Sequence, residues 1–322
     1  MTTSSSTFTG SMERARRGVG VGGSGRPPGS RRRGIAPGRA RTLTFLVLPS
    51  IILVLLLNAY PVIYAGIQSL RNGDLIASGD FIGLKNYTSV LTDPSFWASA
   101  RFTLIFTLVG VFGSWAVGLG VAMLLRGKVP LGGFFKVLLL LPWVVPTVVS
   151  ATAWNWLVAT PQSPLPMLAK SLGFGNVLFL ADPLLAQIVV CVFKVWISFP
   201  FMMMMMSAAL ASVDTNVYEA ARVDGATGWQ MFRHMTLPLT ARSTYISWIL
   251  MTIFCVNDFP TVFLLTHGGP VNATQTLVVK AYQTVFLEFR TGPGVAIAFL
   301  MTIVLVVISV VLFKGVQKAA IE

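Results

Sequence analysis

Residues 218–239 have the sequence YEAARVDGATGWQMFRHMTLPL and lie between two long apolar runs, residues 184–210 and 245–265. An apolar run of about 20 residues can cross a membrane as a helix, so this charged segment is expected at a membrane surface. Gly225 suits the left-handed position that follows a helix end. The segment therefore predicts a hairpin of two short helices joined by a glycine turn, within residues 214–239.

Two capping patterns define the starts of the predicted helices. Asp214, Thr215 and Asn216 each offer a start for the first helix. Asn216 followed by Glu219, and Thr227 followed by Gln230, have the spacing of capping boxes, in which side chains and backbone N–H groups bond reciprocally. The first helix is expected to end just before the glycine and the second to continue to about Thr236.

Small side chains gather on one side of the first predicted helix: Val217, Ala220, Ala221 and Asp224. A surface of this kind lets another backbone approach closely, which favours docking of a partner protein. The alternative is an amphipathic loop that lies in the lipid headgroups. The residues alone leave both interpretations open.

The composition of the 322-residue chain is typical of an integral membrane protein, with 54% hydrophobic residues, 11% charged residues and a mean hydropathy of +0.74. The alternating segments of a membrane barrel are absent. Six apolar stretches are long enough to span a membrane, at residues 43–67, 97–125, 133–157, 184–210, 245–265 and 295–313. Prolines inside the spans, Pro142 and Pro146 among them, indicate bent helices packed around a cavity. The chain is therefore predicted to be all-α and polytopic, with a six-helix bundle in residues 42–322.

Residues 1–41 differ from the rest of the chain, being rich in Ser, Gly, Pro and Arg, which predicts a disordered tail. They contain nine of the 24 Lys and Arg residues. These charges fit a cytoplasmic flank of the first span, and attraction to anionic lipid or RNA is the alternative. Since no small-residue cleavage site follows, the tail is expected to be retained.

The distribution of Lys and Arg predicts the orientation of the bundle. One side of the predicted spans has 17 of these residues and the other has six. Because cytoplasmic loops are enriched in Lys and Arg, both termini and the hairpin are expected in the cytoplasm. Loops 71–96, 158–183 and 267–294 are then extracytoplasmic.

Polar residues inside the spans are candidates for a solute path, because a charge at the bilayer centre costs about 2.5–3.5 kcal/mol on insertion scales. Lys194 lies near the middle of the fourth span, and Asn257 and Asp258 lie in the outer part of the fifth. They either face a water-filled cavity, where they can meet solute hydroxyl groups, or form a structural Lys–Asp pair. A lysine that reaches the interface is a third reading. The further candidates for the path are Asn155, Trp154 and Trp196.

Other chemistries have little support in the sequence. Cys191 and Cys255 lie in apolar runs, and His234 and His267 are too far apart to predict a metal site. No catalytic cluster is present, and no G-x-x-x-x-G-K-[ST] phosphate-binding loop occurs. We therefore expect no metal, no catalytic residues and no nucleic-acid partner.

The hairpin resembles the EAA motif of the permease subunits of binding-protein-dependent ABC importers. That motif has Glu-Ala-Ala, three residues, Gly, nine residues, Ile, one residue and Leu-Pro. This chain has EAA at 219–221, Gly225, Met235 in place of Ile, and Leu-Pro at 237–238. Other stretches are similar to the carbohydrate branch of the family, the maltose-type and glycerol-phosphate-type permeases: FIGLKNYTSVLTDPSFWASARFTL, LPWVVPTVVSATAWNWL and NDFPTVFLLTHGGPVNATQTLVVKAYQTVF.

The resemblance, which extends from residue 43 to the C-terminus, implies a type I ABC importer permease bundle. In that family the hairpin is a coupling helix that rests in a cleft of a cytoplasmic ATPase and transmits its closure to the bundle. The residues expected at this contact are Glu219, Ala220, Ala221, Asp224 and Gly225. The resemblance also favours contact between an external binding protein and Gly268, Gly269 and Pro270, for which a mere re-entry turn is the alternative.

The function implied is import of a sugar or oligosaccharide across the bacterial cytoplasmic membrane, without enzymatic activity or a cofactor in this chain. ATP and Mg²⁺ would be bound by two partner ATPase subunits. Further expected partners are a second permease subunit of different sequence, an extracytoplasmic substrate-binding protein and membrane lipid.

Two alternatives remain. The solute could be glycerol phosphate, a polyamine or an amino acid. A stand-alone secondary transporter or channel is the alternative from another class; it predicts paired repeats and coupling-ion carboxylates at mid-depth. Asp258 is the only carboxylate in the predicted spans and no matching halves occur, which disfavours this class.

Overall fold

The structure, a computed structural model, describes residues 37–318 except residues 75, 78 and 128. Most of the predicted tail, residues 1–36, lies outside the described residues. The chain divides into two units, residues 1–56 and 57–322, and each is described by itself. Helix α1 (Pro37–Ser69) begins in the first unit, four residues before the predicted end of the tail.

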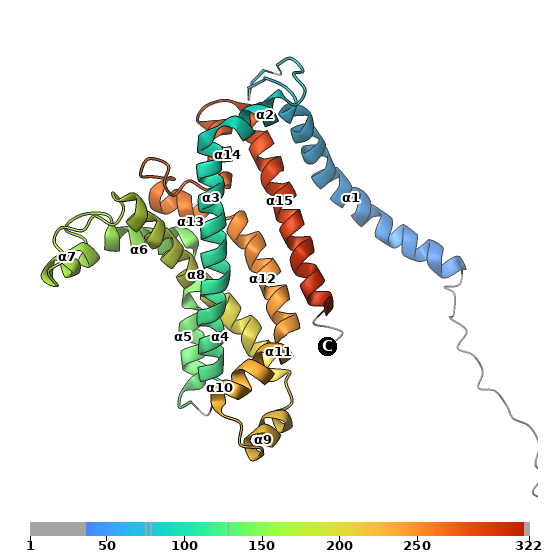
Figure 1. Cartoon of the computed structure of the whole chain (residues 1–322). Helices are drawn as coiled ribbons and strands as arrows, with labels where there is room; N and C mark the ends of the chain where they lie inside the picture. The colour runs from blue at the N-terminus through green and yellow to red at the C-terminus, as the bar shows by residue number, and fades with distance from the viewer. Residues whose placement is uncertain (1–36, 75, 78, 128, 319–322) are drawn as a thin grey trace, which may run out of the picture. The chain divides into compact units, whose positions relative to one another are not determined.

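The regular secondary structure in the described part of the second unit is helical, apart from one isolated bridge between Arg71 and Phe81. Helices α2 and α14 lie at one end of this unit and α9 lies at the opposite end (Figure 1). After α1 the elements, with η marking a π-helix, are α2 (Lys85–Thr92), α3 (Pro94–Leu108), η1 (Val109–Gly113), α4 (Ser114–Leu124), α5 (Gly132–Val144), α6 (Thr147–Val158), α7 (Pro164–Ser171), α8 (Pro183–Ala211), α9 (Thr215–Val223), α10 (Gly228–Met231), η2 (Phe232–Thr236), α11 (Leu237–Leu239), α12 (Ala241–Val256), α13 (Phe259–Thr266), α14 (Leu277–Phe286) and α15 (Thr291–Lys318).

Four predicted spans are confirmed as long apolar helices. They cover Phe45–Ser69, Pro94–Leu124, Pro183–Ala211 and Thr291–Lys318, each within a few residues of the predicted bounds. Two bent pairs of helices bring the number of candidate spans among the described residues to six if each pair crosses once.

The third predicted span is not one straight helix. Helices α5 and α6 meet at a 90° bend, where Val145 is extended (ψ 133°) and Pro146 follows it. Proline has no N–H to donate, and it disfavours the helical conformation of the residue before it. The span predicted over residues 133–157 is therefore a pair of helices with a sharp bend at the second of its two prolines.

The fifth predicted span is also interrupted. Helix α12 ends at Val256, α13 begins at Phe259, and Asn257 and Asp258 lie in the break. The Asp258 carboxylate accepts a hydrogen bond from the Thr261 N–H (3.0 Å), which caps the new helix. A polar cap inside an apolar run therefore divides the predicted helix in two.

Helices α4 and α8 pack closely because α4 has a glycine at the contact. A Cβ added to Gly118 would lie 2.7 Å from the Met202 Cβ and 2.7 Å from the Met203 backbone nitrogen. Gly120, two residues further on, has no atom within 4 Å of such a Cβ. The absence of a side chain at Gly118 therefore sets the distance between the two helices.

We expect Gly118→Ala to destabilise the protein by about 1–3 kcal/mol, the usual cost of overpacking, because backbone as well as side chain must move. Gly120→Ala, on the open side of the same helix, should leave stability unchanged or slightly higher. Thermal unfolding of the purified variants in detergent measures the difference. Equal melting temperatures for the two variants would contradict the close packing described.

Candidate functional site

The hairpin predicted from residues 214–239 is present. Helix α9 is capped by Asp214, whose Oδ1 accepts a hydrogen bond from the Asn216 N–H (2.9 Å). Of the three helix starts that the sequence offered, Asp214 is the one used, and the alternative start, the capping box of Asn216 and Glu219, lies inside the helix. Gly225 follows the helix with φ +81°, the left-handed conformation expected for it.

The second half of the hairpin begins as predicted and ends differently. The Gln230 N–H donates to the Thr227 Oγ1 (3.3 Å), and the Thr227 N–H donates to the Gln230 Oε1 (2.7 Å), which confirms the capping box. The helix does not stop near Thr236 but passes through η2 and α11 to Leu239. Pro238 is accommodated because it lies in the first turn of α11.

The expected ATPase contact residues do not share one free surface. Ala221 is buried within its own chain, whereas Glu219, Ala220, Asp224 and Gly225 are exposed. Val223, which sequence reasoning did not single out, is 87% exposed on the same helix. The surface available to a partner therefore includes Val223 and excludes Ala221.

The two charged candidates for the solute path, Lys194 and Asp258, form an ion pair. The Lys194 Nζ lies 2.6 Å from the Asp258 Oδ2, and the two side chains are only 6% and 10% exposed. Asp258 also accepts a hydrogen bond from the Thr261 hydroxyl (2.8 Å). The pair joins α8 to the break between α12 and α13. The two side chains therefore have the geometry of the Lys–Asp pair that was one of the alternatives for these residues.

The ion pair borders a cavity of about 350 Å³. Its walls come from α8, from the bend of the third span and from the break in the fifth: Trp143, Thr147, Lys194, Ile197, Ser198, Phe254, Asn257, Asp258, Pro260 and Thr261. The Ser198 hydroxyl is buried and has no hydrogen-bond partner among the described residues. A buried hydroxyl in this position can bond to a polar solute or to water.

The other path candidates lie elsewhere. Trp154 and Trp196 pack against each other, with ring centroids 5.6 Å apart, and neither lines the cavity at Lys194. The Asn155 Nδ2 donates to the Leu265 carbonyl (3.2 Å) and borders a separate open cavity of about 650 Å³. The structure therefore brings together Lys194, Asn257 and Asp258, and separates them from the two tryptophans.

Two residues of the site were missed from the sequence. Ser198 follows Lys194 by one helical turn, which places both on the same face of α8, so the spacing could have indicated it. Gly110 lies in η1, where an added Cβ would be 2.7 Å from the Cys255 Sγ and 3.2 Å from the Lys194 Cγ. This glycine makes room for the lysine stem, and no local pattern identifies it.

The loop with Gly268, Gly269 and Pro270 is anchored at its base. The Gln187 Nε2 donates to the Ala273 carbonyl (2.6 Å), and the Gln283 Nε2 donates to the His267 carbonyl (3.0 Å). Gly268 is buried and the next two residues are half-buried, whereas Val271 is 95% exposed. The tip at Val271 and Asn272 is therefore the part of this loop that is free to meet a partner.

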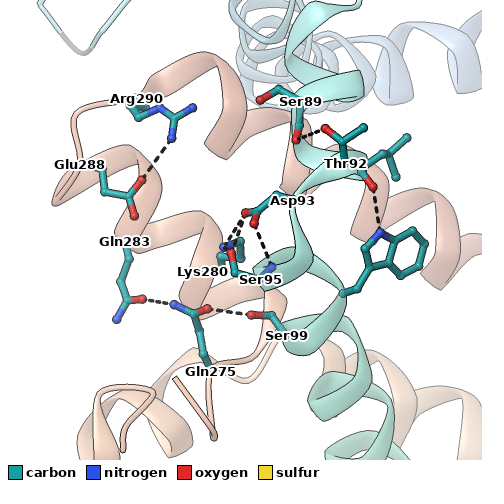
Figure 2. Close-up of polar contacts among 12 residues, drawn as sticks. Ser89, Thr92, Asp93, Ser95, Ser99, Gln275, Lys280, Gln283, Glu288 and Arg290 are labelled. Carbon is teal, nitrogen blue, oxygen red and sulfur yellow. Dashed lines mark hydrogen bonds and ion pairs between the residues drawn. The ribbon is translucent and has the colours of Figure 1, made fainter. Parts of the chain in front are cut away.

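A polar network beside this loop joins α3 to α14, as Figure 2 shows. The Ser99 hydroxyl donates to Gln275 (2.7 Å), which also donates to Gln283. Lys280 forms an ion pair with Asp93 (3.3 Å). Partial burial raises the pKa of the Asp93 carboxyl, but hydrogen bonds from Ser95 and the charge of Lys280 outweigh it and hold that pKa below its usual value.

A bundle of apolar helices with an exposed hairpin at one end and polar cavities at its helix breaks defines a polytopic membrane transport subunit. Residues 115–320 match the family described as the binding-protein-dependent transport system inner membrane component. The chain belongs to this family.

Known relatives and a solved structure agree with this assignment. The chain is 36% identical to a probable ABC transporter permease protein, y4oQ, of Sinorhizobium fredii, over 84% of this chain and 88% of the relative. It is 31% identical to the trehalose/maltose transport system permease protein MalF of Thermococcus litoralis, over 84% of this chain and 91% of that protein. The crystal structure of a bacterial ABC transporter involved in the import of the acidic polysaccharide alginate has a chain of the same fold, with a TM-score of 0.75 and 20% sequence identity. The match covers 87% of this chain and 96% of that chain.

Proposed function

We propose that this chain is one of two different membrane subunits of an ATP-driven importer, and that a carbohydrate crosses the bacterial cytoplasmic membrane between them. The observation that carries the proposal is the hairpin, which is capped at both helix starts, turned by a left-handed glycine and exposed at Glu219, Ala220 and Asp224. A rigid element of this kind can transmit a displacement applied to it.

The hairpin contacts one of two partner ATPase subunits, which bind ATP and Mg²⁺ and hydrolyse ATP. The excess of Lys and Arg on the hairpin side of the spans supports a cytoplasmic position for it and for both termini. At the opposite face, Val271 and Asn272 and the turn at Gly268 to Pro270 contact an extracytoplasmic substrate-binding protein. Closure of the ATPase subunits opens the path outward, and hydrolysis resets it.

The cavity at Lys194 and Asp258 is this chain's share of the solute path, together with Asn257 and Asn155. Because Asp258 already neutralises Lys194, the cavity has no uncompensated charge to attract an anion. An ion pair and a free hydroxyl offer donors and acceptors to the hydroxyl groups of an uncharged solute. This chemistry favours a sugar over glycerol phosphate or a polyamine.

Uptake of radiolabelled solutes by cells with and without the gene tests the proposal. We expect deletion to abolish uptake of at least one uncharged sugar from a panel that contains trehalose, maltose and longer maltodextrins, and restoring the gene to recover it. Uptake of glycerol 3-phosphate, spermidine and amino acids should be unchanged. Loss of one of these instead of a sugar contradicts the solute class, and uptake that persists after depletion of cellular ATP contradicts an ATP-driven importer.

A further inference from the structure

Tyr218, which directly precedes the Glu-Ala-Ala segment, contacts two other parts of the bundle. The guanidinium carbon of Arg126 lies 4.4 Å from the centroid of the Tyr218 ring. The Tyr218 hydroxyl lies 3.1 Å from the Thr236 hydroxyl. One half-buried side chain of α9 is therefore held by a cation–π contact and by a hydrogen bond.

The two contacts lead to different spans. Arg126 follows α4, at the end of the second span. Thr236 is buried in η2, and its carbonyl accepts a hydrogen bond from Thr240 (2.7 Å) at the 67° bend that leads into α12. Among the described residues, and apart from the bond of Asn216 to the cap residue Asp214, these are the only hydrogen-bond and cation–π contacts between a side chain of α9 and another helix or loop.

We propose that Tyr218 is a positioning residue that transmits displacement of α9 to the second and fifth spans, through Arg126 and Thr236. The inference rests on the proposed function and deepens it. Covalent connections already join the hairpin to the fourth and fifth spans. The cation–π contact adds the second span, so α4 and α8, which pack together at Gly118, move with the hairpin as one body. Without Tyr218 the hairpin can tilt while the second span stays in place.

The test uses the transporter with its native partners, affinity-purified into lipid nanodiscs, with an environment-sensitive fluorophore on Val271→Cys. Cys191 and Cys255 are buried, so the label reports the extracytoplasmic loop. Fluorescence is recorded with MgATP and with MgATP plus vanadate, and ATP hydrolysis is measured on the same sample. We expect Tyr218→Ala and Arg126→Gln to retain the ATPase subunits and to hydrolyse ATP, with a fluorescence change about threefold or more smaller.

Arg242→Gln is the matched control, because Arg242 is an exposed cytoplasmic-side arginine without a ring contact among the described residues, and its response should equal the parent's. If Tyr218→Ala no longer retains the ATPase, the fluorescence change of Arg126→Gln decides whether the inference holds, because Arg126 lies outside the hairpin and its replacement leaves the hairpin sequence intact. Full responses from both variants overturn the inference while the proposed function stands. Failure of the parent to retain an ATPase, or to respond to ATP, overturns the proposed function and the inference with it.

Discussion

Gly225→Pro is expected to lower uptake at least about tenfold while the chain remains inserted in the membrane, because proline fixes φ near −65° and cannot adopt a left-handed turn. The native φ is +81°. Proline also removes the N–H that donates to the Arg222 carbonyl (3.1 Å). Both changes act on the turn between α9 and α10. Because this turn sets the angle between the two helices, α9 should lose its position relative to α10. Uptake by whole cells, normalised to the amount of membrane-inserted chain, measures the effect.

The surroundings of Gly225 allow sharp controls. An added Cβ meets no atom within 4 Å, so the only obstacle to a side chain is backbone conformation. Alanine costs about 1–2 kcal/mol in the left-handed region, whereas asparagine tolerates it well. We therefore expect Gly225→Asn to transport nearly normally and Gly225→Ala to be intermediate. Gly228→Pro should be harmless, because Gly228 is the first residue of α10. Normal uptake by Gly225→Pro would contradict the coupling role of the hairpin.

Breaking the ion pair of Lys194 and Asp258 should have the second large effect. Lys194→Met leaves a buried carboxylate without its partner, and loss of one member of a buried pair destabilises a protein by about 3–5 kcal/mol. The two side chains are 6% and 10% exposed, so little water can compensate. We expect Lys194→Met to unfold at a lower temperature than wild type, in thermal unfolding of the purified chain in detergent.

The double variant Lys194→Met with Asp258→Asn separates stability from transport. Removal of both charges should restore most of the stability, since the asparagine oxygen can still accept from the Thr261 N–H and cap α13. Uptake should stay at least about tenfold below wild type, because the charged donors and acceptors of the cavity are gone. A stable double variant with normal uptake would mean that the pair is structural alone.

The hairpin could be predicted because its determinants are local. Gly225, Thr227 and Gln230 fix the turn and the second helix start through contacts within a few residues. The start of the first helix stayed open between Asp214, Thr215 and Asn216, because all three are good capping residues and the choice depends on the exact path of the chain from α8. Burial of Ala221 depends on packing and has no signal in its own sequence context.

The geometry of the breaks in the spans and the ion pair required the structure. The prolines of the third span indicate a bend, but they give neither its angle, which is 90°, nor which proline forms it. Asp258 and Lys194 are 64 residues apart in the chain, and the sequence left open whether they meet each other, the solute or water. The π-helix η1, which places Gly110 over the lysine stem, is a response to packing between spans.

Affinity purification of the full chain from native membranes in mild detergent, with mass spectrometry of the co-purifying proteins, tests the central claim most directly. An importer subunit should bring with it a nucleotide-binding ATPase subunit and a second polytopic permease of different sequence, and the sample should hydrolyse ATP. The ATPase should be absent when the same purification is made from Gly225→Pro cells. Recovery of the chain alone, or as a homo-oligomer without an ATPase, would contradict the importer and favour a stand-alone transporter.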